Sequence, residues 1–121
     1  MQVELEVNGR CLIARLSGEI DLNVADNLRA QLEQALNDNP NVRHLIFNTR
    51  NVSFLDSSGL GVILGRYKRI STHGGKMAFT GLQDPVRKVL ELSGVTKLSY
   101  QFSTEEEAVT NLEQGGMGSE L

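Results

Sequence analysis

Two adjacent serines follow an aspartate near the middle of the chain, in the segment Asp56-Ser57-Ser58-Gly59. Apolar residues recur at helical spacing after them, so the serines stand at the start of a predicted helix. Side chains at a helix N-terminus lie beside backbone N–H groups that lack intrahelical partners and near the positive end of the helix dipole. Such a corner caps the helix, binds an anion or carries a phosphorylated serine. The residues alone leave these three chemistries open.

Three glycines in the same helix raise the alternative of a nucleotide-binding loop. Gly59, Gly61 and Gly65 follow a predicted strand, but the third comes one residue too late for the G-x-G-x-x-G fingerprint. About eight residues also separate that predicted strand from the helix, which is long for such a motif. Gly61 and Gly65 are one helical turn apart, so we expect both on one face, packed closely against a sheet.

A catalytic serine would need a general base and an oxyanion hole. The flanks of Ser57 and Ser58 do not form G-x-S-x-G, and His44 and His73 fall at a predicted strand start and a predicted helix end. No group of Cys, His and carboxylate residues has the spacing of metal ligands. We therefore predict no enzymatic activity, no catalytic residue, no metal and no cofactor.

The bulk properties are those of one globular domain of 121 residues. A net charge of −3 offers no basic field for nucleic acid. Cys11 is the only cysteine and is predicted to be a buried, inert thiol. The N-terminus lacks the basic and apolar regions of a signal peptide, and no apolar run approaches the roughly 18 residues of a membrane helix. We expect a cytoplasmic protein without membrane or nucleic-acid partners.

Alternating strands and helices must position the serine corner. Strands are predicted at residues 3–7, 12–16, 43–48, 76–80 and 98–102. Helices are predicted at residues 22–37 and 57–73, from 84 up to 94, and after 104. Strands that alternate with helices predict an α/β fold with a parallel or mixed sheet.

Turn and capping residues mark the ends of these elements. Asn8-Gly9 predicts a two-residue hairpin loop, and Gly74-Gly75 predicts the end of the second helix. Asp21 or Asn23 is expected to cap the first helix, and Asp84 the third. The second helix also carries basic residues that we expect to form a patch on its exposed side: Arg66, Lys68 and Arg69.

The segment Asp56–Lys68 resembles the signature of the anti-sigma factor antagonists, which are bacterial STAS-domain proteins. Further similarity lies at residues 16–21, 43–46 and 86–94, and the sporulation branch, which opposes the anti-sigma F kinase, is the most similar. The resemblance implies a STAS domain over residues 1–113, with a mixed four- to five-stranded sheet and about four helices. A disordered tail is expected at residues 114–121.

This resemblance implies a partner-switching function. In the family, the unphosphorylated antagonist binds an anti-sigma factor that is also a serine kinase, and the sigma factor is released. Phosphorylation inactivates the antagonist, and a PP2C-type phosphatase restores it. The phosphoacceptor directly follows the motif aspartate, which corresponds to Ser57 here, with Ser58 as the nearest alternative. The residues expected to contact the partner are Asp21, Asn23, Asp56, Ser57, Ser58, Gly59, Leu60 and Gly61.

One departure from the family pattern follows Asp21, where the sporulation branch often has two histidines and this chain has Leu22 and Asn23. Two alternatives therefore stay open: a STAS module that binds nucleotide weakly, and a STAS component of a different, stress-type regulatory complex. A phosphate at a helix N-terminus is tolerated electrostatically. We thus expect phosphorylation of Ser57 to block the partner's access and to leave the helix intact.

Overall fold

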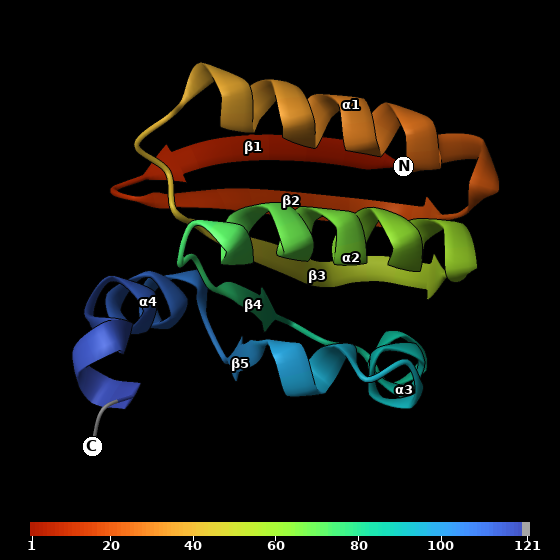
Figure 1. The fold of residues 1–121 in the computed structure, drawn as a ribbon. Coiled ribbons are helices and arrows are strands. Elements are labelled where there is room, and N and C mark those ends of the chain that lie inside the picture. The colour runs from red at the N-terminus through yellow and green to blue at the C-terminus, as the bar shows by residue number, and fades with distance from the viewer. Residues whose placement is uncertain (120–121) are drawn as a thin grey trace.

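The computed structural model describes the backbone of residues 1–119 and the side chains of residues 1–114. The strands are β1 (Gln2–Asn8), β2 (Cys11–Ile20), β3 (His44–Leu55), β4 (Met77–Thr80) and β5 (Tyr100–Phe102). The helices are α1 (Leu22–Asp38), α2 (Ser57–Thr72), α3 (Asp84–Leu92) and α4 (Glu105–Ser119), with a short 3₁₀ helix, η1 (Val95–Leu98). The strands form one sheet in the order β1-β2-β3-β4-β5 (Figure 1). Only β1 is antiparallel to its neighbour, so the predicted mixed sheet is confirmed.

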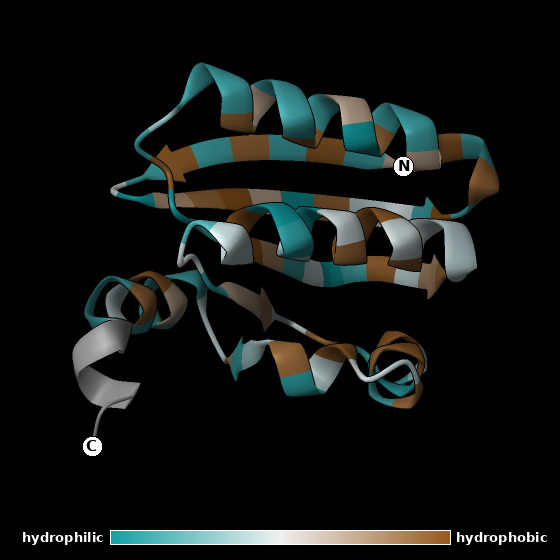
Figure 2. Cartoon of the chain, in the orientation of Figure 1, coloured by the Kyte–Doolittle hydropathy of each residue, from teal (hydrophilic) through white to brown (hydrophobic). Residues whose placement is uncertain are grey.

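Helices cover the two faces of the sheet unequally. Alternate side chains of a strand point to opposite faces, and β1 accordingly alternates between apolar and polar residues (Figure 2). Under α1, α2 and α3, the main core joins strand residues such as Phe47 and Phe79 to Leu28 of α1 and Ile63 of α2. A smaller cluster on the opposite face joins the strands to α4, through Cys11, Ile13, Ile46, Ala78, Ala108 and Leu112.

Strand β3 is longer than the sequence predicted. The expected strand at residues 43–48 continues to Leu55, because β2 remains paired with it up to Ile20 and Leu55 through two register shifts. Thr49, Val52 and Leu55 are buried at every third position and the residues between them are exposed, a spacing that lacks the two-residue period of a half-buried strand. Only Asp56 separates β3 from α2. The expected gap of about eight residues between strand and helix is therefore wrong.

The β1–β2 hairpin is shifted by one residue from its predicted position. Asn8 pairs with Cys11, so the loop is Gly9-Arg10 and not Asn8-Gly9. Gly9 has a φ of +61°, which glycine adopts without steric cost. The loop thus starts at the residue that best tolerates a left-handed backbone.

The helix ends agree with the sequence in part. Asp21 caps α1, and Gly74, with a φ of +79°, follows the end of α2 as predicted. At α3 the prediction is wrong, because Gln83 is the N-cap residue and makes no side-chain capping bond, while Asp84 is already helical. Asp84 still lies in the first turn, where its charge is favourable to the helix dipole.

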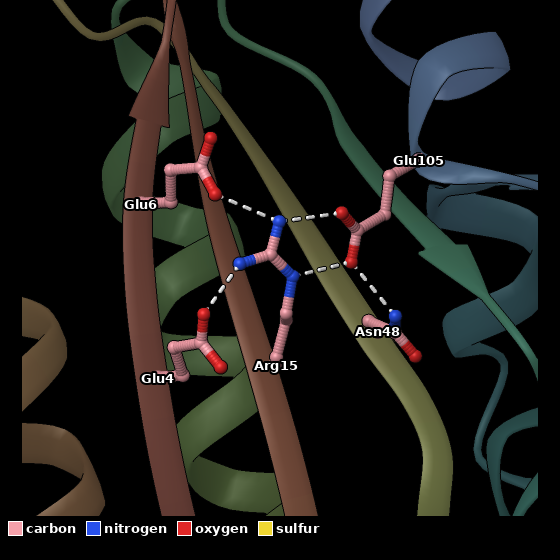
Figure 3. Close-up of polar contacts among 5 residues, drawn as sticks. All are labelled: Glu4, Glu6, Arg15, Asn48 and Glu105. Carbon is pink, nitrogen blue, oxygen red and sulfur yellow. Dashed lines mark hydrogen bonds and ion pairs between the residues drawn. The ribbon is translucent and has the colours of Figure 1, made fainter.

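A charged cluster holds the first turn of α4 on the sheet face opposite the main core (Figure 3). The Arg15 guanidinium of β2 donates to both Glu105 carboxylate oxygens, over 2.8 and 2.7 Å. It also pairs with Glu4 and Glu6 of β1, each at 2.8 Å, and Asn48 of β3 donates to Glu105 over 2.8 Å. Hydrogen bonding to Arg15 lowers the pKa of Glu105 from its ordinary value. Arg15 thus joins β2 to β1 and α4, and Glu105 extends the cluster to β3.

Helix α4 runs to Ser119, past residue 114, where the sequence predicted the tail to begin. Residues 120 and 121 of that expected tail lie outside the described residues. Within the helices that are described, no stretch has both the length and the hydropathy needed to cross a bilayer.

Candidate functional site

The N-termini of α1 and α2 lie at the same end of the sheet, at the right in Figure 1. Strands β2 and β3 are parallel and pair up to Ile20 and Leu55, so they end at the same level. A single aspartate then connects each strand to its helix, Asp21 before α1 and Asp56 before α2. The corner that these junctions form contains the serine segment.

Asp56 occupies the centre of this corner. Its Oδ1 accepts from the backbone N–H groups of Ser58 and Gly59, over 2.8 and 3.1 Å, and thereby caps α2. Its Oδ2 accepts from the backbone N–H of Leu22, the first residue of α1, over 3.1 Å. Its own N–H donates to the Ile20 carbonyl over 3.2 Å. Both carboxylate oxygens are thus engaged, one on each helix.

Asp21 is the N-cap residue of α1. Its Oδ1 accepts from the backbone N–H of Asn23 over 3.0 Å. The sequence left Asp21 and Asn23 as alternative caps, and the structure shows Asp21 in that role. Asn23 is exposed on the first turn of α1, and its side chain is accessible to a partner.

The two serines differ in accessibility. Ser57 is the first residue of α2 and is exposed, whereas Ser58 is half-buried. Leu60 is also half-buried and packs against the main core, so much of its side chain serves the fold. Of the two hydroxyls, that of Ser57 is the more open to an approaching protein.

The glycines of α2 have different roles from those predicted. A Cβ on Gly59 would lie 2.6 Å from Leu55 Cδ1 and 2.8 Å from the Ile20 carbonyl oxygen, so the first turn of α2 sits tightly on the strand ends. A Cβ on Gly61 or Gly65 would meet nothing within 4 Å. The expectation that this pair packs against the sheet is therefore wrong, because both glycines face open space.

The predicted basic patch on α2 is also wrong for two of its three members. Arg66 lies against α1, where its Nε is 2.9 Å from Glu33 Oε2, and its side chain is only 11% exposed. Arg69 pairs with the same Glu33 over 2.8 Å and donates to Asn37 over 2.9 Å. Lys68 alone is exposed. Residue patterns along α2 could not indicate these ion pairs, since the pairs depend on how α1 and α2 pack together.

Other candidate groups lie away from the corner or are inert. A cavity of about 740 Å³ lies at the opposite end of α2 and includes Arg43 and His73, where Arg43 donates to the His73 carbonyl over 3.1 Å. Cys11 is buried as predicted, and burial raises the pKa of its thiol to about 12, which disfavours the reactive thiolate. Among the described residues, no group of three metal-ligating side chains is close enough to hold an ion.

Comparison with known proteins identifies the fold family. The STAS domain family model matches residues 2–108, most of the chain. The chain belongs to the STAS domain family. This STAS domain is 42% identical over 113 residues to the anti-sigma F factor antagonist of Paenibacillus polymyxa, and the aligned region covers 93% of this chain and 96% of the relative. The family resemblance predicted from the serine segment is thereby confirmed.

Solved structures agree with this assignment. The anti-sigma factor antagonist SpoIIAA in its unphosphorylated form matches the STAS domain with a TM-score of 0.81 and 32% identity, over 93% of this chain and 96% of that chain. The Bacillus cell fate determinant SpoIIAA in the phosphorylated form matches with a TM-score of 0.73 and 32% identity, over 91% and 98%. The predicted STAS fold is confirmed.

The fold brings the predicted partner-contact residues to one corner of the STAS domain. Asp21 precedes α1, Asn23 lies in its first turn, and the remaining six run from Asp56 to Gly61. Leu22 also belongs to this corner, which its residue type did not indicate, because it contributes only its backbone N–H to Asp56. No side-chain pattern signals a backbone donor.

Proposed function

We propose that this STAS domain is an anti-sigma factor antagonist controlled by phosphorylation of Ser57. Unphosphorylated, it binds an anti-sigma factor with serine-kinase activity and thereby releases a sigma factor. The similarity to anti-sigma F factor antagonists over most of the chain supports this function. The structural observation that carries the proposal is the exposed Ser57 hydroxyl, on the first residue of a helix that Asp56 already caps.

The capping pattern indicates how a phosphate would act. The backbone N–H groups of Leu22, Asn23, Ser58 and Gly59 already donate to Asp21 or Asp56. A phosphate on Ser57 would find these amides occupied and would add about −1.5 to −2 charges beside two carboxylates. Repulsion and bulk at the docking surface would then exclude the kinase without melting α2.

The outer face of α2 supports close docking beside Ser57. Glycine in a helix interior costs about 0.5–1 kcal/mol relative to alanine. Nothing inside the molecule occupies the position of a Cβ on Gly61, so packing within the domain does not explain the residue. A partner that approaches the backbone of α2 would explain it.

The remaining parts of the proposal follow from the same switch. A PP2C-type phosphatase would remove the phosphate, and the domain itself would bind partners without performing catalysis. The switch would operate in the cytoplasm, where sigma factors meet RNA polymerase. Direct nucleotide binding at α2 is less favoured, because Asp56 already holds the amides that would cradle a phosphate.

The test is to incubate the protein with its cognate anti-sigma kinase and ATP and to map the phosphorylated residue by mass spectrometry. We expect one phosphate on Ser57, none on the Ser57→Ala variant, and an unchanged Ser57 phosphate on Ser58→Ala. Phosphorylation at Ser58 in the wild type would contradict the assigned acceptor. A wild-type protein that neither binds the kinase nor accepts phosphate would contradict the proposed function.

A further inference from the structure

Asp56 does more at this corner than cap its own helix. A serine or asparagine would cap α2 as well, because one acceptor oxygen is enough for that role. The second carboxylate oxygen instead accepts from Leu22 N–H of α1, over 3.1 Å. Helix α1 has its own cap in Asp21, so this bond joins two helices that are each capped already.

The surrounding contacts make this junction rigid. Asp56 N–H donates to the Ile20 carbonyl, so Asp56 is bonded to residues on both sides of Asp21. Gly59 sits on Leu55 and Ile20 with no room for a Cβ, so the first turn of α2 has little freedom to shift. Through its two carboxylate oxygens, Asp56 bonds the starts of both helices.

From this geometry we propose that Asp56 is a positioning residue that holds the contact residues of α1 in register with Ser57. The inference rests on the proposed function, since it concerns how the same kinase docks. A kinase that contacts Asn23 on α1 and Ser57 on α2 at once must find them at a fixed separation. When that separation is set before binding, less conformational entropy is lost in the complex.

Substitutions can separate the two roles of Asp56, which are to cap α2 and to bond the Leu22 N–H of α1. In Asp56→Ser, the short hydroxyl still reaches the amides of its own helix but not Leu22 N–H. In Leu22→Pro, the donor itself is removed, and proline is well tolerated at the first position of a helix. Thr104→Ala is the control, because Thr104 accepts from Glu107 N–H over 3.1 Å at the start of α4, and its loss removes a cap elsewhere.

The experiment measures kinase affinity, the KM and kcat for Ser57 phosphorylation, and the melting temperature of each variant. Both Asp56→Ser and Leu22→Pro should raise Kd and KM by about tenfold, the equivalent of one organised hydrogen bond, with kcat within about twofold. Thr104→Ala should lower the melting temperature by about as much as the two corner variants do, and it should leave Kd and KM unchanged. Hydrogen exchange at the Leu22 amide should accelerate in Asp56→Ser.

Each contrary result has a distinct meaning. If wild type binds the kinase and both variants bind equally well, the positioning role is excluded while the proposed function stands. If Thr104→Ala weakens binding as much as the two variants do, the effect is one of general stability, and the inference is wrong. If the wild-type protein does not bind the kinase, the proposed function is wrong, and the inference that rests on it is wrong as well. Should Leu22→Pro not fold, Asp56→Ser alone decides between these outcomes.

Discussion

Ser57 is exposed beside two carboxylates, those of Asp21 and Asp56, and each already accepts a hydrogen bond from a helix amide. A negative group at this position finds the amides of Ser58 and Gly59 already bonded to Asp56 and adds charge to an acidic corner. Its main effect is therefore expected on the partner and not on the fold. Substitutions at single residues of the corner can test this separation of stability from binding.

Ser57→Asp is expected to abolish measurable kinase binding, with an affinity loss of more than about a hundredfold. The introduced carboxylate repels the partner much as the phosphate would, although with less charge. The melting temperature should stay within about 2 °C of wild type, because the residue is exposed. Isothermal titration calorimetry and thermal melts measure the two effects. A variant that binds normally, or that unfolds, would contradict the mechanism.

Gly61→Ala is expected to stabilise the domain by about 0.5–1 kcal/mol, since alanine is the better helix former and its methyl group enters open space. The same methyl group should weaken kinase binding by about tenfold if the partner touches the helix backbone there. Denaturant unfolding and a binding titration give the two values. Unchanged affinity would place Gly61 outside the interface.

Gly59→Ala should have the opposite stability effect. Its Cβ would lie 2.8 Å from the Ile20 carbonyl oxygen, which is part of the backbone and cannot rotate away. We expect a loss of about 1–3 kcal/mol in the free energy of unfolding, as for other overpacked sites. Equal stability of Gly59→Ala and Gly61→Ala would contradict the different environments of the two glycines.

At the scale of elements, α4 depends on a small apolar cluster and on Arg15 for its position on the sheet. The main core does not include α4, so this helix has few buried contacts of its own. Burying a charged pair contributes little in net terms, but removing one partner leaves the other without compensation. Glu105 is the partner that α4 supplies, and its side chain is only 16% exposed.

Glu105→Gln is expected to destabilise the domain by about 1–2 kcal/mol near neutral pH, through loss of the charged hydrogen bonds to Arg15. Because the pKa of Glu105 is lowered in the folded state, its contribution is present above the ordinary glutamate pKa of about 4.3. That contribution is lost as the pH falls through the lower folded value. Unfolding free energies of wild type and variant should therefore converge in acid. A constant difference across the acid range would contradict this role for Glu105.

At the interface between α1 and α2, the position of one helix determines which side chains of the other remain exposed. Glu33 of α1 pairs with Arg66 and Arg69 of α2, and burial lowers the pKa of Arg66 from its ordinary value despite that pairing. Residues that looked like a solvated basic patch on one helix are therefore part of the contact between two helices. The face of α2 left for a partner is the one with Ser57, Gly61 and Lys68.

At the scale of the whole molecule, the corner with Ser57 lies at the N-terminal end of α2, and the cavity lined by Arg43 and His73 lies at the other end of that helix. The corner exists because the parallel strands β2 and β3 end together and each turns directly into a helix. That arrangement places the two aspartate-capped N-termini side by side, which is why one carboxylate can bond both.

The sequence by itself determined the locally encoded features. Apolar periodicity placed α1 and α2 within a residue of their ends, and the serine segment indicated the family, which in turn implied the fold. These succeed because helix period, caps and turn glycines depend on neighbours within a few positions. The proposed acceptor, Ser57, and its neighbour Asp56 also come from one continuous segment.

Only the tertiary structure decided the features that depend on distant segments. The length of β3 was set by its pairing with β2, the pairing of Arg66 by Glu33, and the open position of Gly61 by the placement of α2 on the sheet. The bond from Leu22 to Asp56 spans 34 positions and uses a backbone donor, which every residue type but proline possesses. Side-chain patterns cannot signal such a contact, because it arises only where two strands end at the same edge.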